Sequence, residues 1–409
     1  MKIIIINNFI KPYSIGGAER VTEITARNLA AKKQEVVLIT SGKHKKIRTE
    51  NPLPNLKIYR FLPKNIYFNY PPGIKRIRFS KSIWWLINLW NPFVFWRIRK
   101  ILRNEKPDVI HIHNFYSLSV SVFSAALSQR VPVFFTAHDY FPLCKNSILL
   151  SKKAQLCWRL CFWCRLWSSW NKLFITRKVR FIFPSYFARN CYKRDFLRTG
   201  PVIPNPIYPD VEEIRKNQEQ KNKVRSRGKP GTVFLYIGRL GPHKGIKTLL
   251  KAFTRVSEKH VTLLIAGRGE LERTIIRSAQ KDKRIKYMGF ITEERKKKVL
   301  LASDVLVFPS ECFEVSPVIL VEAYSYGLPV IATDLGSIKE HIDPGRTGFL
   351  FPYRDDRELT RCVEKFSQKK VRIEEMRDSC FHKAAFLNKE KSMTEYIKIM
   401  ERTVNLNYS

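Results

Sequence analysis

Acidic side chains are scarce in this sequence. It has 35 Asp and Glu against 75 Lys and Arg, which gives a formal net charge of +40 over 409 residues. In residues 1–200, 36 basic residues face 8 acidic ones, and the stretches 51–104 and 140–194 contain no carboxylate. All eight tryptophans lie in these two stretches. The charge calls for an anionic partner, and tryptophan interleaved with Lys and Arg is typical of an anionic membrane surface.

Long apolar runs are also absent. A membrane-spanning helix needs about 20 consecutive apolar residues. The best candidate, 84–96, is 13 residues long and contains Asn88, Asn91 and Pro92. The first nine residues, MKIIIINNF, lack the pattern of a signal peptide and predict a buried strand. We therefore expect a cytoplasmic protein that lies peripherally on the inner face of the cell membrane.

Several signature motifs are missing as well. The sequence has no Walker A, HExxH, GxSxG, helix-turn-helix, zinc-finger or RNP signature, so no nucleic-acid partner is expected. Asp-x-Asp does not occur, which argues against metal-dependent nucleotide-sugar chemistry. Four cysteines cluster within 21 residues: Cys144, Cys157, Cys161 and Cys164. Their spacing is compatible with a metal site, but the paired CxxC motifs of a zinc ribbon are absent, which favours free thiols beside the tryptophans.

Short apolar runs alternate with helical periodicity along the whole chain. The runs are 3–6, 36–40, 109–112, 131–136 and 180–184, then 233–238, 262–267, 285–290, 305–310 and 329–333. Apolar strands that alternate with helices predict parallel sheets covered on both faces. Prolines at 201, 204 and 206 mark the connector between the two series. We predict an α/β chain of two doubly wound Rossmann-like domains, with ligand crevices at the carboxyl ends of their strands.

Two further segments are less regular. Residues 210–230 are polar and charged, and predict an exposed excursion. The tail, about 385–405, has a helical pattern with Phe386, Met393, Tyr396 and Met400 as its apolar residues.

Two candidate sites lie where a strand leads into a helix. Gly16 and Gly17 follow the first strand, where backbone N–H groups at a helix start can meet a phosphate, although a tight turn explains them equally well. Glu314 and Glu322 are eight residues apart and flank a helix start at which Ser316 is the expected N-cap and Pro317 the first helical residue. Such carboxylates can hold sugar hydroxyls. A surface charge and a helix ion pair are the alternatives.

Basic and imidazole side chains follow other strands. Arg239 and Lys244 lie on the loop after the run 233–238, where they could neutralise a diphosphate leaving group. A solvated basic loop is the alternative. His138, in the sequence TAHDY, follows the run 131–136 and could donate to a sugar hydroxyl, or serve a structural role. His113 is expected beside the same crevice.

The order and spacing of these motifs are more specific than any one of them. GGAE after the first strand, TAHDY, Pro204-Asn205-Pro206, Gly238-Arg239-Leu240 with Lys244-Gly245, and Glu-x7-Glu running into EAYSYGLPVIATD occur in register. Together they resemble glycosyltransferase family 4, the retaining enzymes of the GT-B fold, from residue 1 to about 400. The sequence departs from the family after Glu314, where Val315-Ser316-Pro317 replaces the Gly and aromatic residue of many members.

The resemblance implies a complete assignment. Residues 1–205 would bind the acceptor, 206–384 would bind a nucleotide-sugar across an interdomain cleft, and a helix in 385–409 would return to the first domain. Catalysis would use His138, Glu314, Arg239 and Lys244, with no metal and no cofactor besides a UDP- or GDP-linked donor. Donor contacts would come from Gly16, Gly17, Arg239, Lys244, Arg268, Met288, Gly289, Phe290, Glu314, Ser316, Pro317, Val318 and Glu322.

The expected activity is therefore transfer of a sugar, with retention, to a lipid-linked or cell-envelope polysaccharide acceptor such as lipopolysaccharide. A non-catalytic scaffold of the same fold that binds a membrane or a polyanion is the alternative. The donor base, the sugar and the linkage are not encoded in any motif that we recognise.

Overall fold

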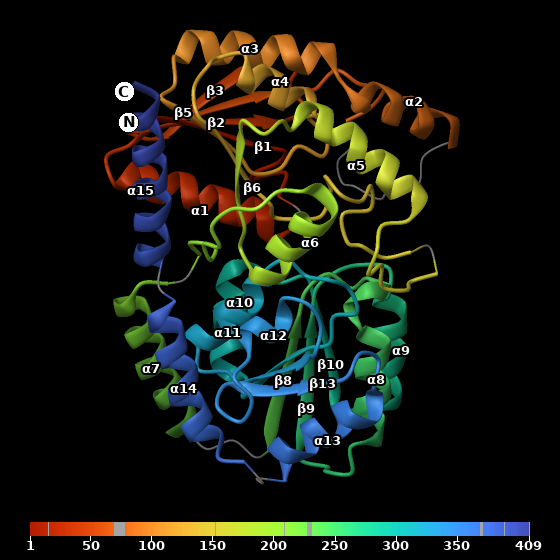
Figure 1. Cartoon of the computed structure of the whole chain (residues 1–409). Helices are drawn as coiled ribbons and strands as arrows, with labels where there is room; N and C mark the ends of the chain where they lie inside the picture. The colour runs from red at the N-terminus through yellow and green to blue at the C-terminus, as the bar shows by residue number, and fades with distance from the viewer. Residues whose placement is uncertain are drawn as a thin grey trace. The chain divides into compact units, whose positions relative to one another are not determined.

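The chain divides into two compact units (Figure 1). A computed structural model describes residues 1–14, 16–68, 78–151, 153–207, 209–226, 231–368, 371–387 and 389–408. Unit 1 comprises Met1–Leu149, Cys157–Ile207 and Glu390–Ser409, and unit 2 comprises Leu150–Leu156 and Tyr208–Lys389. The domain boundaries that we predicted fall after residues 205 and 384.

Unit 1 is built on a seven-stranded sheet. Its strands are β1 (Lys2–Asn7), β2 (Glu35–Ser41), β3 (Arg48–Leu53), β4 (Leu56–Phe61), β5 (Val109–Ile112), β6 (Val133–Thr136) and β7 (Val179–Ile182), in the order β3-β4-β2-β1-β5-β6-β7. All neighbouring strands are parallel except β3 and β4, which form an antiparallel hairpin at one edge. The expectation of a purely parallel sheet is wrong at this edge, because a two-residue turn joins the two strands.

Six helices in the first part of the chain cover this sheet. They are α1 (Gly17–Ala31), α2 (Arg78–Leu89), α3 (Pro92–Glu105), α4 (Ser121–Leu127), α5 (Phe162–Phe174) and α6 (Tyr186–Phe196). The start of α3 illustrates the local rules. The Oδ1 of Asn91 accepts from the backbone N–H of Val94 at 3.1 Å, and Pro92 occupies the first turn, where no N–H is needed.

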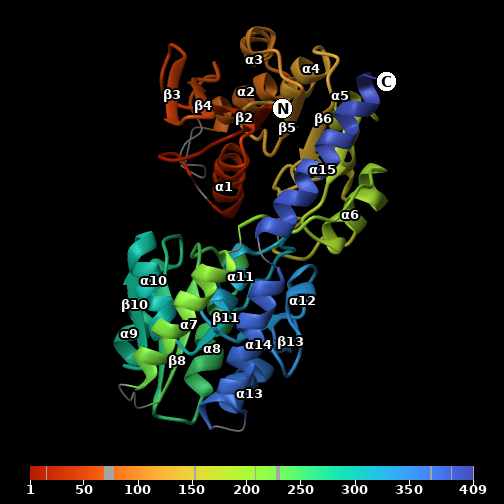
Figure 2. The same cartoon turned by 90° about the vertical axis from the view of Figure 1, so that its left-hand side faces the viewer.

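The tail forms α15 (Lys389–Tyr408), a long helix that belongs almost entirely to unit 1 (Figure 2). Met393, Tyr396 and Met400 are at most 1% exposed and pack in a cluster with residues of β1, β2 and α1. The prediction that Phe386 is part of the same apolar pattern is wrong. Phe386 is the last residue of the preceding helix, Ile373–Phe386, and is 68% exposed.

Unit 2 is built on a six-stranded parallel sheet. Its strands are β8 (Thr232–Ile237), β9 (Val261–Ala266), β10 (Ile285–Gly289), β11 (Val305–Phe308), β12 (Val330–Thr333) and β13 (Gly348–Phe351). The spatial order is β10-β9-β8-β11-β12-β13, which is the 3-2-1-4-5-6 order of a Rossmann sheet. In unit 1 the strands β4, β2, β1, β5, β6 and β7 follow the same order. The predicted fold class, two doubly wound Rossmann-like domains, is confirmed.

Helices flank the second sheet. They are α7 (Val211–Ser226), α8 (Ile246–Arg255), α9 (Glu272–Lys281), α10 (Glu293–Ala302), α11 (Val318–Ser325), α12 (Ile338–His341), α13 (Asp356–Ser367) and α14 (Ile373–Phe386), with a 3-10 turn η1 at Pro242–Lys244. The described part of the predicted excursion over 210–230 is exposed along one side, as expected, but it forms the helix α7, which packs on the unit by its other side. Ile214, Asn217 and Lys221 on this helix are buried against the unit.

Candidate active site

In unit 2 the loops that follow β8 and β11 meet at the point where the strand order reverses. Ligands of open parallel sheets bind outside the carboxyl ends of the strands at such a point. The backbone N–H of Glu311 donates to the carbonyl of His243 at 2.8 Å and joins the two loops. Gly245 has a φ of +69°, and a Cβ there would lie 1.7 Å from the carbonyl oxygen of Pro309. Only glycine allows this approach of backbone to backbone.

Lys244 and Glu314 form an ion pair at this point. The Nζ of Lys244 donates to Oε1 of Glu314 at 2.6 Å, and the hydroxyl of Ser310 donates to the same oxygen at 2.6 Å. The two charged side chains are 21% and 17% exposed. The alternative that Glu314 is a surface charge is therefore excluded.

The electrostatics of the pair favour its charged form. Burial by itself would raise the pKa of Glu314, but the Lys244 ammonium outweighs it, and the pKa lies below its ordinary value. Burial likewise opposes the charge on Lys244, and the Glu314 carboxylate raises the pKa of Lys244 above its ordinary range. Burial and then the neighbouring Lys244 lower the pKa of His243 to about 4, so this imidazole is neutral at pH 7.

The helix after Glu314 begins one residue later than predicted. Pro317, with φ −74° and ψ 109°, is the N-cap, and Val318 is the first helical residue of α11. The prediction that Ser316 is the N-cap is wrong, because the extended backbone of Pro317 keeps the helix from starting before Val318. The first backbone N–H groups of α11 thus follow Glu314 closely along the chain, and a helix N-terminus favours a negatively charged group.

Glu322 lies on the second turn of α11, as the spacing predicted. Both of its oxygens accept from the Nζ of Lys296 on α10, at 3.0 and 3.3 Å. The two side chains are 12% and 11% exposed. Glu322 thus forms an ion pair with a neighbouring helix in this structure, and its contact with a donor stays a prediction.

The loops after β9 and β10 complete the same edge of unit 2. The Arg268 guanidinium lies 5.5 Å from the ring centroid of Phe290, which is 64% exposed. The N–H of Gly267 donates to the carbonyl of Gly289 at 2.8 Å and joins the two loops. Gly267 has a φ of +145°, and a Cβ there would lie 1.9 Å from the carbonyl oxygen of Gly238. Met288 and Gly289 are half-buried beside them.

Two predicted site elements belong to unit 1. Gly16 is the N-cap of α1, and its N–H donates to the Glu19 carboxylate at 2.9 Å, while Gly17 is exposed as the first helical residue. His138 follows β6, and its Nε2 lies 2.8 Å from Nδ1 of His113, which follows β5. Burial lowers the pKa of His138 to about 3, so the pair is neutral at pH 7.

The candidate residues therefore form two groups. Unit 2 carries Arg239, Lys244, Arg268, Met288, Gly289, Phe290, Glu314, Ser316, Pro317, Val318 and Glu322, and unit 1 carries Gly16, Gly17 and His138. The sequence analysis missed Ser310 and Lys296, the partners of the two glutamates. Ser310 stands four residues before Glu314 in PSECFE, so this contact could have been predicted from the sequence. No local pattern links Lys296 to Glu322.

The cysteines form no disulfide in this structure. All eight cysteines are free thiols. Among the described residues, no group of three or more His, Cys, Asp or Glu side chains is arranged to hold a metal ion. No described helix is long and apolar enough to cross a bilayer.

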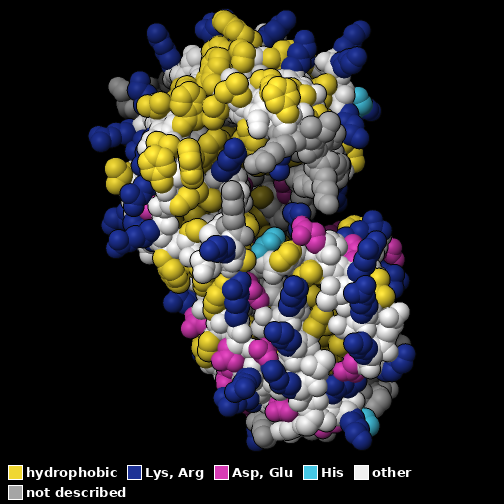
Figure 3. Space-filling model, turned by 90° about the vertical axis from the view of Figure 1, so that its right-hand side faces the viewer, with side chains coloured by type: hydrophobic (Ala, Val, Ile, Leu, Met, Phe, Trp, Pro, Cys, Tyr) yellow, Lys and Arg dark blue, Asp and Glu magenta, His cyan; other side chains and the backbone are white. Residues whose placement is uncertain are grey.

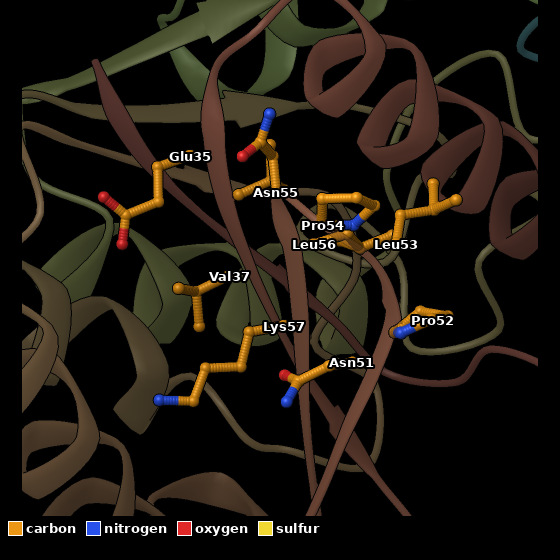
Figure 4. A pocket seen from close by; sticks show the side chains of 10 residues that line it. Glu35, Val37, Asn51, Pro52, Leu53, Pro54, Asn55, Leu56 and Lys57 are labelled. Carbon is orange, nitrogen blue, oxygen red and sulfur yellow. The ribbon is translucent and has the colours of Figure 1, made fainter.

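A pocket of about 470 Å³ lies in unit 1 along β2, β3 and β4. Figure 4 shows the side chains of Glu35 and Lys57 among those that line it. None of the predicted site residues lines this pocket, and we assign it no role in catalysis.

Comparison with known proteins places the chain among sugar-transferring enzymes. Residues 15–211 match the family model "Glycosyltransferase Family 4", and residues 231–369 match "Glycosyl transferases group 1". A 42.6 kDa protein in the cps region of Klebsiella pneumoniae is 25% identical over 83% of this chain and 87% of its own length. The phosphatidyl-myo-inositol mannosyltransferase of Mycobacterium leprae is 26% identical over 71% of this chain and 69% of its own.

A solved structure agrees with the fold. Anabaena HepE in complex with UDP superposes with a TM-score of 0.69, covers 98% of this chain and 100% of its own, and is 18% identical. Two Rossmann-like domains define the GT-B class of glycosyltransferases. The chain belongs to glycosyltransferase family 4.

Proposed function

We propose that this glycosyltransferase moves a hexosyl or related residue from a UDP- or GDP-linked sugar to a lipid-linked or cell-envelope polysaccharide acceptor, with retention and without a metal. The observation that carries the proposal is the Lys244–Glu314 pair at the strand-order reversal of unit 2, 2.6 Å apart. It joins a cation suited to a diphosphate with a carboxylate suited to sugar hydroxyls at one position. The relatives support the donor and acceptor classes, because HepE binds UDP and the mycobacterial enzyme is named for a phosphoinositide.

The proposed roles follow from the charges. When the nucleoside diphosphate leaves, negative charge develops on its phosphates, and Arg239, Lys244 and the N-terminus of α11 stabilise it. Lys244 has three N–H donors, so it can keep Glu314 in place while it binds a phosphate oxygen. Glu314 accepts a bond from the transferred sugar. Glu322 releases Lys296 and accepts hydrogen bonds from the ribose hydroxyls of the donor. Arg268 and Met288–Phe290 lie beside the nucleotide base.

His138 is the proposed contact to the sugar near its anomeric carbon. Because its pKa is about 3, it acts as a neutral hydrogen-bonding group and not as a cation at pH 7. Its partner His113 is 1% exposed and holds the ring by the 2.8 Å bond. Gly17 would offer its backbone N–H group to the donor phosphates, and Gly16, whose N–H is bonded to Glu19, would shape the turn beside it.

We further propose that the acceptor is met at an anionic membrane surface. Unit 1 exposes Trp158, Phe162, Trp163, Leu166 and Leu173 by 51–75%, on α5 and the loop before it. α2 packs beside α5 through Trp85 and Trp167, whose rings are 5.7 Å apart, and exposes Phe79 and Leu86. Figure 3 shows hydrophobic side chains gathered on this face of unit 1 among Lys and Arg side chains. Trp84, by contrast, is buried, so not every tryptophan serves a surface role.

The experiment is nucleotide release from a panel of UDP-, GDP- and ADP-sugars, with and without a bacterial lipid extract. Release that requires one donor together with the extract supports the proposal. Glu314→Ala should abolish release, because the sugar loses its carboxylate and Lys244 its partner. Glu294→Ala, an exposed glutamate on α10 in the same unit, is the matched control and should leave release unchanged. If no donor is hydrolysed or transferred and none binds by calorimetry, the proposal is wrong.

A further inference from the structure

Two cysteines in the sequence Cys161-Phe-Trp-Cys164 lie at the start of α5 in unit 1. Cys161 is the N-cap and is exposed, whereas Cys164 lies in the first turn and is half-buried. The thiols of Cys161 and Cys164 lie within hydrogen-bonding reach of each other. Residues three apart at a helix start have Cβ atoms about 5–6 Å apart, against about 3.5–4.5 Å in a disulfide. A local rearrangement of the first turn that brings these Cβ atoms about 1–2 Å closer therefore allows the S–S bond to form.

The two thiols have opposite environments. The backbone N–H groups of Cys164 and Trp163 lower the pKa of Cys161. Burial, together with the neighbouring thiols of Cys144 and Cys161, raises the pKa of Cys164 well above its ordinary value. Cys161 is thus the better nucleophile, and Cys164 is held protonated in reserve.

The surrounding charge favours an anionic reaction partner. Residues 140–194 contain twelve basic residues and no carboxylate, and Arg159 and Arg165 flank the pair in sequence. An excess of positive charge of this size in the surrounding sequence attracts a negatively charged small molecule. Oxidised glutathione is a disulfide of this charge class.

We propose that Cys161 and Cys164 form a thiol–disulfide exchange site that reacts with small anionic disulfides. The Cys161 thiolate attacks one sulfur of the small disulfide, whose S–S bond breaks and releases one thiolate, which takes a proton from water. Cys164 then gives its proton to solvent and attacks Sγ of Cys161, and the second small thiol leaves. The small disulfide is reduced to two thiols, and the protein gains one disulfide. Transient disulfides of this kind are the usual exception to the reduced state of cytosolic cysteines.

This proposal does not depend on the sugar-transfer function. It assigns chemistry to a motif that the glycosyltransferase site does not use. It also gives Cys144, which is 2% exposed, only the role of a neighbour behind Cys164.

The experiment treats the full-length protein with oxidised glutathione and follows its mass and its thiols by mass spectrometry. The native protein should lose two hydrogen atoms, and a peptide with a Cys161–Cys164 disulfide should appear. Cys164→Ser should instead trap glutathione on Cys161, and Cys161→Ser should do neither. At pH 7, iodoacetamide should modify Cys161 at least about tenfold faster than an ordinary thiol.

Two controls keep the test decisive. Cys191→Ser, which removes a buried thiol in the same unit, should react like the native protein, and the thermal unfolding midpoint reports whether each variant folds. If Cys144→Ser abolishes closure while Cys164→Ser does not, the assignment of the pair is wrong. If the thiols react only after a chelator releases bound zinc, the cluster is a metal site and the proposal is overturned.

Discussion

The charges of Lys244 and Glu314 depend on each other because both are largely removed from water. Removing one partner leaves the other as an uncompensated charge in a poorly solvated position. The pair is not completely buried, since its side chains are 21% and 17% exposed, so solvent screening reduces this cost.

Lys244→Met should therefore destabilise unit 2 by about 2 kcal/mol, a lowering of about 4–8 °C in its thermal unfolding midpoint. The double variant Lys244→Met with Glu314→Gln should recover much of this loss, because the orphaned carboxylate is gone. Differential scanning calorimetry measures both. A double variant that is less stable than either single variant would contradict the account of the pair as mutually compensating charges.

For single residues, the sequence predicts the secondary-structure position of a side chain better than it predicts the partners that the side chain contacts. Glu314 was expected in a loop before a helix and lies there, because Pro317 and Gly327 bound the helix locally. Its bond to Lys244 spans 70 residues, and the bond from Lys296 to Glu322 spans 26. Such contacts depend on the strand order of the sheet, which no local pattern encodes.

At the scale of elements, α7 shows how a buried polar residue misleads sequence reasoning. Its composition is typical of an exposed segment, yet Lys221 is completely buried. The Nζ of Lys221 donates to the carbonyls of Leu300 and Leu301 at 3.1 and 3.0 Å, and to that of Ser303. The ammonium thus caps the carboxyl end of α10, where a cation is favoured by the helix dipole.

Lys221→Met should destabilise unit 2 by about 2–3 kcal/mol, because three carbonyls at the end of α10 lose their donor while the side-chain volume is kept. Chemical denaturation followed by far-UV circular dichroism measures the change in the free energy of unfolding. Lys223→Met on the exposed side of the same helix is the matched control, expected to change stability by less than about 0.5 kcal/mol. Equal effects of the two substitutions would refute the capping role.

Most strands, unlike α7, were predicted correctly from the sequence. The ten apolar runs all contain a strand, because residues buried on both faces of a parallel sheet leave a continuous apolar signal. β3 and β4 were missed, since β3 is an exposed edge with the polar sequence RTENPL. β13, GFLF, is too short to stand out beside its turn. The strands were therefore predictable where the sequence is a continuous apolar run, including the edge strands β7 and β10, and not where the strand is polar, as in β3, or very short, as in β13.

At the scale of the whole molecule, unit 1 contains a buried imidazole cluster that should make it acid-labile. Burial lowers the pKa of His111 and of His138 to about 3, and it also lowers the pKa of His113 well below its ordinary value. The unfolded chain binds a proton at each of these groups below pH 6.5, and the folded chain does not, so stability is lost as the pH falls from 6.5 towards 3. Asp139 acts in the opposite sense, because burial raises its pKa to about 6 and the folded state keeps its proton.

Because three imidazoles are opposed by one carboxyl, the folded state binds fewer protons than the unfolded chain between pH 6 and 4, and each proton of difference costs about 1.4 kcal/mol per pH unit. The thermal midpoint of unit 1 should fall steeply over this range, and His111→Gln should reduce the slope by about one proton. His44→Gln, an exposed histidine in the same unit, should leave the slope unchanged. A native slope that does not change in the His111 variant would show that the cluster titrates in the folded state.

The charge of the whole chain bears on the membrane proposal. The excess of +28 in residues 1–200 predicts binding to vesicles that contain phosphatidylglycerol and not to neutral vesicles, with the binding weakened by high salt.

Charge alone would attract any part of the basic protein surface to the vesicle, whereas insertion into the bilayer interface requires the exposed aromatic face. Trp163→Ser with Leu166→Ser on α5 should therefore weaken vesicle binding by about tenfold or more, since each side chain loses about 1 kcal/mol of apolar burial. Ile276→Ser, an exposed apolar residue of unit 2, is the control and should bind normally in vesicle flotation. Equal binding by all three proteins would leave only a diffuse electrostatic attraction and would contradict a defined membrane-facing surface on α5.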